Sequence, residues 1–583
     1  MKDYEETIAF LGEWGTFQWL IFIALGLGVV PNGYWPVSMV FVGDIPPHHC
    51  RVPFLNSSYG EQDYNLSIPT EELKGEIILS RCRRYTEKRD SYSAYSNDTE
   101  GCVDGWVFSK ERYASTIVTE WSLVCDDAWK APFPVTVFFF GSLAGSFGSG
   151  ILSDRYGRKI TFFSAKVLQI LLGFLLAAST RWEMFCVLYC ALGVMTTTTY
   201  CVCFALGSEI LIKSARESFG ILVAVLYGAG YTIPPVLAFF IRDWRILQTG
   251  LSLVVFIYIP LFWYIPESPR WLITQGRLQE AEAIIRAAAK RNGITPPEKI
   301  FQLEHSADTK ATEHVEDSCK FTYLDPLKKG NDRISVITLP EDILQLELSS
   351  DTKGTKRGSS GRDKYTWLDL LKNQNMRNIT FINILTWLTI SLTYFGLSLD
   401  ISNLDGDPCV NSLISAATEF VGCVFLWFSI HYAPRRFVLP FTLLLGGALQ
   451  LFIQLVPNEL SGLIITLVVT GRLVMIGAFG FVFVYSSELF PTVVRGMGLG
   501  VSSMAGGIGC ALSPYVAHIG TYNKTLPFIL MGTISLFSGG LSLLLPETKG
   551  EKLPELISQV KPLQGCCLKM KSGDGIRVNG HVE

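Results

Sequence analysis

The chain has 583 residues, of which 49% are hydrophobic and only 17% are charged, with a formal net charge of −3. A soluble chain of this length would form about three or four domains and carry ~25% charged residues. This composition excludes an ordinary soluble protein, and no basic patch indicates a nucleic-acid partner.

Apolar residues gather in twelve runs of about 17–26 residues, the length that a helix needs to cross ~30 Å of hydrocarbon. The runs lack the alternation of barrel strands, so the sequence predicts an all-α membrane protein with twelve transmembrane helices. No basic segment or cleavage site precedes the first run, and we expect no removable signal peptide. The runs are 17–42, 133–152, 161–179, 184–208, 218–241, 246–265, 378–399, 410–431, 436–456, 461–487, 497–519 and 525–545.

Short loops indicate orientation, because Lys and Arg are enriched on the cytoplasmic side of a membrane. Here basic residues follow the even-numbered runs, whereas short loops after odd-numbered runs hold few of them. The sequence therefore predicts that both termini are cytoplasmic and that residues 43–132, between the first two runs, are extracellular. The basic residues in question are Arg155, Arg158, Lys159, Lys213, Arg216, Arg435, Arg436 and Arg495.

The predicted extracellular loop 43–132 combines cysteines with glycosylation sequons. An even number of cysteines in an oxidising compartment predicts disulfides, and three pairings stay open. Sequons on the same side predict a glycoprotein. The cysteines are Cys50, Cys82, Cys102 and Cys125, and the sequons begin at Asn56, Asn65 and Asn97.

A second hydrophilic segment, 266–377, is predicted to be a cytoplasmic loop. It begins with a helical pattern, LQEAEAIIRAAAK, and continues through a polar stretch at 303–363 that we expect to be partly disordered. The expected organisation is a six-helix half, this loop, a second six-helix half and a cytoplasmic tail, at 1–265, 266–377, 378–545 and 546–583.

The stretch GSEILIKSARESFG (207–220) is close to a phosphate-binding loop, but Ile212 stands where that loop needs glycine. An internal repeat gives the stretch another meaning. Glu209 and Arg216 recur 279 residues later as Glu488 and Arg495, and PESPRWL recurs as PETKGEKL 280 residues later. Two related halves explain both spacings. We interpret each acid and Arg as a gating ion pair between helices; the alternative is charge that only sets topology.

The segment GSGILSDRYGRK (148–159) resembles the loop between helices two and three of the major facilitator superfamily. Six positions match G-x-x-x-D-R-x-G-R-[RK]. The resemblance implies two six-helix halves and adds gating residues that can pair with a neighbouring helix end. The matching residues are Gly150, Asp154, Arg155, Gly157, Arg158 and Lys159.

Further segments are similar to the solute carrier 22 family of organic ion transporters, above all to its organic cation/carnitine branch. The resemblance covers nearly the whole chain except 303–363, and it implies transport of carnitine, ergothioneine or organic cations across the plasma membrane, in some members with sodium. Apart from sodium as a coupling ion, the resemblance implies no cofactor. The segments are DYEETIAFLGEWGTFQ, IVTEWSLVCDDAWK, FIRDWR, YFGLSLD and YSSELFPTVVRGMGLGVSSMA.

The chain departs from that branch in three places. Ile212 replaces a glycine of its relatives. Gly506 and Gly507 stand in helix eleven, where carnitine and anion transporters have Arg and cation transporters have Asp, so a substrate carboxylate loses its obvious counter-charge. The tail ends in NGHVE and lacks the terminus that relatives use to bind PDZ-type scaffolds.

Polar residues inside membrane runs are candidates for substrate contact. Asn32 matches a branch position linked to substrate or sodium, or it merely belongs to a helix-kinking Pro-Asn-Gly. Glu419 matches an acidic position and could attract a cation or pair with Arg472, where the branch has Lys. Lys166 stands where relatives are apolar, and we expect its side chain to snorkel to the cytoplasmic surface.

Aromatic faces often recognise organic cations, although aromatic residues in helices can also serve packing alone. Together with Gly507, the remaining substrate-binding candidates are Tyr200, Tyr227, Tyr231, Trp387, Tyr394 and Tyr485.

The sequence thus predicts a plasma-membrane transporter of small organic cations or zwitterions, such as carnitine-like betaines, working by alternating access and with sodium as a candidate coupling ion. Its predicted partners are the substrate and the lipid bilayer. One alternative is a carrier of organic anions or other zwitterions. Another is a non-transporting sensor or accessory subunit, which need not retain gate motifs. An enzyme is not expected, because there is no catalytic constellation, metal-ligand cluster or intact nucleotide loop.

Overall fold

A computed structural model describes residues 8–301 and 369–563 with short gaps, and these residues belong to one compact unit. The sequons at Asn56, Asn65 and Asn97, Ile212, the side chain of Arg216 and the tail NGHVE lie outside the described residues. The gaps are 13, 53–67, 74–75, 87–97, 212, 298–299, 400–406, 458–459, 492–493, 521–522, 524, 550–553, 555–556 and 561.

The twelve predicted runs coincide with helices. In the described chain, eleven segments are long and apolar enough to cross a membrane, and a twelfth apolar helix has 17 residues. We divide the helices into two groups, one for the first six runs and one for the last six. The first group is α2 (Thr16–Leu27), α3 (Val30–Val42), α6 (Phe133–Tyr156), α7 (Arg158–Ala177), α8 (Trp182–Ile210), α9 (Lys213–Gly230), α10 (Ile233–Phe240), α11 (Trp244–Phe256) and η3 (Ile259–Trp263). The second is α16 (Gln374–Leu399), α17 (Pro408–Tyr432), α18 (Arg435–Phe452), η5 (Ile453–Leu455), α19 (Ser461–Leu489), α20 (Arg495–Ile519) and α21 (Leu526–Ser542).

Two of the runs are each divided into two α-helices near a proline. α3 begins with Pro31 in its first turn, just after the break that separates it from α2. Pro234 stands in the first turn of α10 and follows the break after α9. Proline has no N–H to donate and is tolerated in a first turn, so these residues fit a new helix start better than a continuous helix.

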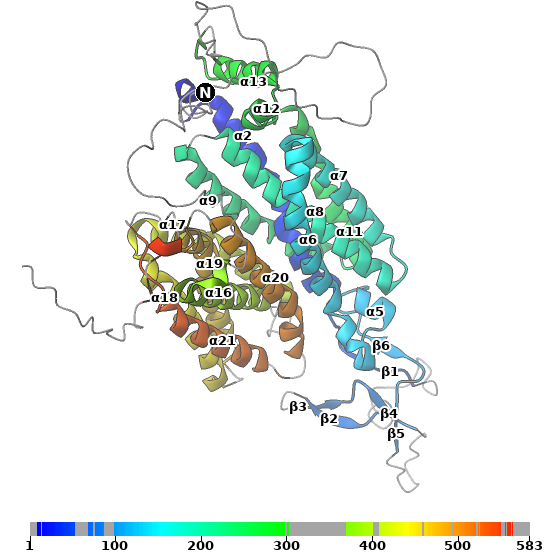
Figure 1. Ribbon diagram of the computed structural model, residues 1–583. Helices are drawn as coiled ribbons and strands as arrows, with labels where there is room; N and C mark the ends of the chain where they lie inside the picture. Colours follow the sequence, from blue (N-terminus) through cyan, green and yellow to red (C-terminus); the bar gives the residue numbers. More distant parts are fainter. Residues whose placement is uncertain are drawn as a thin grey trace, which may run out of the picture. The chain divides into compact units, whose positions relative to one another are not determined.

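The two groups of helices repeat one packing pattern (Figure 1). In the first group α3 packs on α9, α6 and α7 pack on α8, and α7 packs on α11. In the second group α16 packs on α20, α17 and α18 pack on α19, and α18 packs on α21. The halves meet where α6 contacts α20 and where α9 contacts α17. The predicted fold of two related six-helix halves is therefore present.

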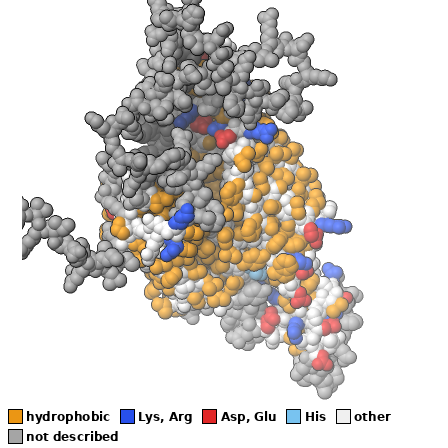
Figure 2. Space-filling view, viewed as in Figure 1, with side chains coloured by type: hydrophobic (Ala, Val, Ile, Leu, Met, Phe, Trp, Pro, Cys, Tyr) orange, Lys and Arg blue, Asp and Glu red, His pale blue; other side chains and the backbone are white. Residues whose placement is uncertain are grey.

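The outer face of the helices is apolar (Figure 2). Hydrophobic side chains cover the visible helical surface, and charged groups gather at its margins. Ile151, Val187 and Phe240 are each at least 70% exposed. A continuous apolar surface of this kind suits contact with lipid, which explains why burial and hydrophobicity do not coincide in this chain.

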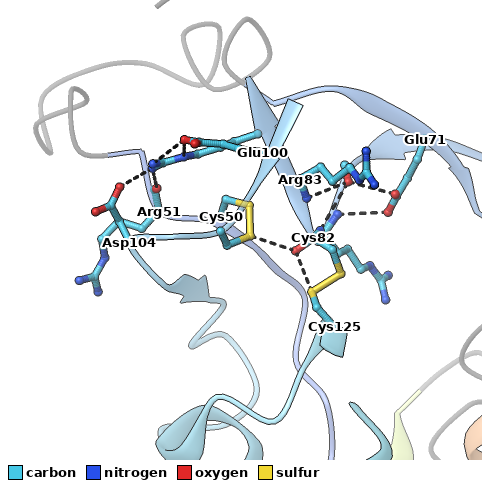
Figure 3. The surroundings of a disulfide bond; sticks show 12 residues. Cys50, Arg51, Glu71, Cys82, Arg83, Glu100, Asp104 and Cys125 are labelled. Carbon is cyan, nitrogen blue, oxygen red and sulfur yellow. Dashed lines mark hydrogen bonds and ion pairs between the residues drawn. A yellow bond between two sulfur atoms is a disulfide. The ribbon is translucent and has the colours of Figure 1, made fainter. Parts of the chain in front are cut away.

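The segment between α3 and α6 forms three small antiparallel sheets joined by disulfides. β1 (His48–Cys50) pairs with β6 (Trp106–Phe108), β2 (Thr70–Leu73) with β3 (Glu76–Leu79), and β4 (Arg83–Tyr85) with β5 (Thr99–Gly101). Of the three pairings left open by the sequence, the structure has Cys50–Cys102 and Cys82–Cys125 (Figure 3). The second disulfide links the sheets to η2 (Cys125–Lys130), directly before α6.

A short helix in this segment docks on the first half. α5 (Ile117–Trp121) carries Glu120, which accepts a hydrogen bond from Trp244 Nε1 at 2.8 Å and pairs with Arg245 at the start of α11. The sequence segments IVTEW and FIRDWR are far apart in the chain, but they contact each other in the structure.

The predicted helix at LQEAEAIIRAAAK is α13 (Leu278–Arg291), preceded by α12 (Pro269–Thr274). It buries Ala281, Ile285, Ala288 and Ala289. Asn292, which ends it, accepts a hydrogen bond from the backbone N–H of Phe17 at 2.9 Å and so holds the start of α2. The remaining elements are η1 (Ala9–Leu11), α15 (Asp369–Lys372) and η6 (Ile557–Gln559).

Candidate functional site

We call the end of the helices that holds residues 153–159 the motif end, and the end that holds Cys50–Cys102 and Cys82–Cys125 the disulfide end. Between them, a buried ion pair lies where the two halves meet. Arg472 of α19 donates from Nη2 to Glu419 Oε1 of α17 at 2.7 Å, and the residues are 2% and 4% exposed. Of the two alternatives that the sequence left for Glu419, the structure has the pair with Arg472.

Two tyrosines complete this cluster, one from each half. Tyr394 of α16 donates to Glu419 Oε1 at 2.9 Å, and its hydroxyl lies 3.2 Å from that of Tyr231 in the first half. The Arg472 guanidinium lies 5.2 Å from the Tyr231 ring centre and 5.9 Å from that of Tyr394. Among the described residues, its buried Nε and Nη1 have no hydrogen-bond partner, which is unusual for buried donors.

The tyrosine rings continue from this cluster into the first half. Tyr227 lies 5.8 Å from Tyr231 and 6.1 Å from Tyr200, measured between ring centres. Gly228 packs against Glu419, where an added Cβ would come within 2.7 Å of the Glu419 Cβ. Four of the predicted tyrosine and charged residues therefore meet directly, and Tyr200 and Tyr227 extend the group.

Asn32 belongs to a second polar cluster, which holds Lys166. The prediction that Lys166 snorkels is wrong: the residue is 1% exposed, and its Nζ lies 3.2 Å from Gln169 Oε1 and 3.5 Å from Asn32 Oδ1. The position of Lys166 in the sequence indicates its depth in the membrane, but it does not indicate on which face of the helix the side chain lies. Gln169, Thr196 and Thr199 complete the cluster, and the sequence analysis missed them.

Three predicted substrate-binding residues lie outside both clusters. Trp387 donates from Nε1 to Ser486 Oγ at 2.8 Å, and Tyr485 donates to the carbonyl of Pro546 at 2.7 Å. At Gly507 an added Cβ would lie 3.3 Å from Leu143 Cδ1 of the first half, so this residue is part of the contact between α20 and α6. A contact with substrate stays a prediction for all three.

At the motif end of the first half, Arg158 connects two acids. It pairs with Glu209 at 3.0 Å and with Asp154 at 2.8 Å. Glu267, from PESPRWL, accepts the backbone N–H of Arg158 at 2.9 Å and that of Lys159 at 3.1 Å. Gly157 has a φ of +100°, and a Cβ there would come within 2.5 Å of Glu267 Oε2, which explains the glycine between the two helices.

The second half repeats this arrangement. Arg435 pairs with Glu488 at 3.4 Å, and Glu547, from PETKGEKL, accepts the backbone N–H of Arg435 at 2.9 Å and that of Arg436 at 3.0 Å. We call Arg158–Glu209–Glu267 and Arg435–Glu488–Glu547 the two acid–arginine sets. The sequence found the acids Glu209 and Glu488 by their spacing but missed Arg435, Glu267 and Glu547 as their companions.

Each acid–arginine set joins helices of one half only. The sequence predicted a gating pair from Glu209 and Arg216. Glu209 bonds Arg158, and the predicted pair with Arg216 stays untested, because the Arg216 side chain is outside the described residues. Arg155 lies over the Tyr156 ring at 5.5 Å, and Arg495 donates from Nε to the carbonyl of Phe490 at 3.3 Å. A gating role for these residues stays a prediction.

Comparison with known proteins agrees with this architecture. The family model described as Major Facilitator Superfamily matches residues 130–514. Among solved structures, the inward open conformation of the xylose transporter XylE from E. coli has a TM-score of 0.54 at 13% identity, covering 93% of this chain and 100% of that one. The chain is a major facilitator superfamily protein, and this class comprises transporters rather than enzymes.

Curated relatives define the branch more narrowly. Organic cation/carnitine transporter 2 of Homo sapiens is 41% identical over 97% of this chain and 95% of that protein. Solute carrier family 22 member 4 of Mus musculus is 38% identical over 97% and 96%. The organic cation transporter protein of Drosophila melanogaster is 32% identical over 95% and 94%. The chain belongs to the solute carrier 22 family.

Proposed function

We propose that the chain carries small organic zwitterions of the carnitine-like betaine type, and organic cations of similar size, across the plasma membrane by alternating access. The observation that carries this proposal is the Glu419–Arg472 pair beside Tyr231 and Tyr394, at the meeting of the two halves. Substrate sites of such carriers lie between the repeats, near the middle of the membrane. The names of the curated relatives, which include organic cation and carnitine transporters, agree with it.

The cluster offers complementary groups to a zwitterion. The Nε–H and Nη1–H groups of Arg472 point to opposite sides of the guanidinium, and each can donate one hydrogen bond to an oxygen of an anionic group. The faces of Tyr231 and Tyr227 can hold a quaternary ammonium group. Arg472 would thereby supply the counter-charge that Gly507 does not provide in helix eleven.

Charge inside the membrane favours a substrate that carries an anionic group. In the described spans, three charged side chains lie far from the helix ends: Lys166, Glu419 and Arg472. Their formal charges leave one positive charge in excess. A bare organic cation would approach an uncompensated positive charge in a medium of low dielectric constant, whereas a carboxylate lowers that energy. This observation also supports the second candidate function, a carrier of organic anions.

The acid–arginine sets and the basic loops give the proposed orientation. By the positive-inside rule, the motif end faces the cytoplasm and residues 43–132 lie outside the cell. We propose that each set keeps the inner ends of its own helices together while the two halves rock against each other. Asp154 extends the first set through its ion pair with Arg158, and Arg155 lies beside it at the same helix end.

Uptake of labelled carnitine, a permanent organic cation and an organic anion by cells expressing the chain tests the proposal. We expect carnitine-like zwitterions to enter fastest, and Arg472→Met to reduce their uptake more than that of the cation. Uptake of the anion alone would favour the second candidate. Specific binding without uptake of any compound would instead identify a ligand sensor.

A further inference from the structure

Lys166 places an amino group inside the first half, and no carboxylate of the described residues pairs with it. The residue lies in the interior of α7, is 1% exposed and, among the described residues, forms no ion pair. A buried unpaired charge costs several kcal/mol, and ionisable residues inside membrane spans are functional by default. The polar groups around the ammonium therefore need an explanation of their own.

The ammonium faces side-chain oxygen atoms of two helices, and a third helix contacts the residues that supply them. Gln169 Oε1 of α7 lies 3.2 Å from Nζ, and Asn32 Oδ1 of α3 lies 3.5 Å from it. Asn32 Oδ1 also accepts a hydrogen bond from Thr199 Oγ1 at 3.5 Å, and Gln169 Nε2 donates to Thr196 Oγ1 at 2.9 Å; both threonines belong to α8. Amide and hydroxyl oxygens gathered in this way resemble the neutral ligand set of a monovalent cation more than a pocket for an anion.

Two roles fit an ammonium in a transporter: attraction of the substrate's negative group, or occupation of a cation site. The geometry favours occupation. The nitrogen is directed at neutral acceptors of its own half, and the rings of Phe162 and Tyr258 lie 5.9 Å from it. Arg472, by contrast, lies at the meeting of the halves with two donors that have no partner in the described chain, and it is better placed for an anionic group.

We propose that the Lys166 ammonium is a tethered substitute for a coupling cation, held by Asn32 and Gln169, which Thr199 and Thr196 support, and that transport by this chain therefore does not use sodium. A covalently attached cation cannot dissociate, so it keeps α3, α7 and α8 in the cation-bound arrangement in every step of the cycle. A sodium gradient can drive transport only if sodium binds one state better than another, and the occupied site removes that difference. The inference deepens the proposed function and rests on it for the uptake measurement.

The first experiment measures uptake of labelled carnitine with external sodium or with N-methyl-D-glucamine in its place. In the unaltered chain and in Lys166→Arg, which keeps the charge, we expect the two rates to agree within about 2-fold. In Lys166→Met, which vacates the nitrogen position, sodium should raise uptake by about 5-fold or more, the lower range of ordinary coupling. Lys290→Met, an exposed lysine of α13, is the matched charge-deletion control and should behave as the unaltered chain.

The second experiment needs no transported substrate, so it separates failure of this inference from failure of the proposed function. The purified chain is unfolded by heat in sodium chloride and in N-methyl-D-glucamine chloride. Sodium should raise the midpoint of Lys166→Met by about 2–4 °C and leave that of the unaltered chain unchanged.

Sodium-dependent uptake or sodium-specific stabilisation of the unaltered chain would overturn the inference. So would a folded Lys166→Met variant that sodium affects in neither experiment. A Lys166→Met variant that folds only when sodium is present supports it, whereas one that fails in both salts contradicts it, because sodium should refill the vacated position.

Discussion

Glu419 and Arg472 place opposite charges where water does not reach, and the free energy of such a pair depends on both partners being present. Removing ions from water costs several kcal/mol each, and the mutual attraction returns this only with good geometry and further hydrogen bonds. Tyr394 supplies one such bond to Glu419 at 2.9 Å. In the described part of the chain, two donors of Arg472 have no partner, so this site is under-satisfied.

This arrangement predicts a strong difference between single and double substitutions. Arg472→Met leaves Glu419 buried and unpaired, and we expect a loss of about 3–5 kcal/mol in unfolding free energy. Arg472→Met with Glu419→Gln removes both charges and should recover most of that loss. Thermal unfolding of the purified variants measures the effect.

The exposed pair Arg277–Glu280 of α13 provides the matched control, because both side chains are about half exposed. The same two changes there, Arg277→Met and Glu280→Gln, should alter stability by no more than about 1 kcal/mol. If the double variant at 472 and 419 is as unstable as Arg472→Met alone, the pair is not the cause of the loss.

Sequence reasoning at this scale works where chemistry alone marks a residue. Glu419, Arg472 and the tyrosines were identifiable because polar and aromatic groups inside an apolar run stand out. Partners were harder to find, because they depend on which face of a helix each side chain occupies. Lys166 was misread for this reason, and Gln169, Thr196 and Thr199 gave no signal, since single polar residues are common in helices and bond their own backbone.

At the scale of elements, the acid–arginine sets cap helices as well as pairing charges. Glu267 and Glu547 each receive backbone N–H groups from the first turn of α7 or α18, where the helix dipole favours negative charge. In Glu547, burial alone would raise the pKa of the carboxyl. Hydrogen bonds from the backbone N–H groups of Lys549, Arg436, Arg435 and Thr548 outweigh burial and hold the pKa below its ordinary value.

The lowered pKa of Glu547 predicts a pH effect with a definite sign. A carboxyl with a depressed folded-state pKa contributes stability that is present above its unfolded pKa of about 4.3 and is lost as the pH falls through the lower folded value. Glu547→Gln should lower the unfolding midpoint near neutral pH by about 2 °C and make it less sensitive to acid below about pH 4. Midpoints measured at several pH values test this.

Glu183→Gln is the control for that series, since Glu183 is an exposed carboxyl in the first turn of α8. Its curve should follow that of the unaltered chain. Parallel curves for Glu547→Gln and the unaltered chain would mean that the cap makes no pH-dependent contribution.

Helix positions were the most predictable feature of the chain, because a hydrocarbon layer dictates both length and composition. The interruptions between α2 and α3 and between α9 and α10 were not predicted: hydropathy continues through them, and only the prolines mark them. The disulfide pairing could not follow from the sequence, since it depends on how three small sheets fold back on one another.

At the scale of the whole molecule, the two halves are alike in packing, and their described contacts join α6 to α20, α9 and α10 to α17, and α3 to α16. The described contacts between them run from the middle of the helices to the disulfide end. Thr136 of α6 donates to the carbonyl of Ala511 in α20 at 2.9 Å, and the rings of Phe139 and Phe395 lie 4.7 Å apart. If the halves rock as proposed, these contacts must separate in the opposite state of the cycle.

A cross-link between the halves should therefore arrest transport. In Thr136→Cys with Ala511→Cys, oxidation should join α6 to α20 and abolish uptake, and reduction should restore it. The control is Ser115→Cys with Asp243→Cys, at a hydrogen bond of 2.5 Å between two residues of the first half. Because both pairs keep the same free cysteines in the membrane, side reactions of those thiols affect them equally. The control should cross-link and still transport, since each half moves as a unit. Uptake that survives a complete Thr136→Cys–Ala511→Cys cross-link would show that these helices stay together throughout the cycle, and rocking about this contact would have to be abandoned.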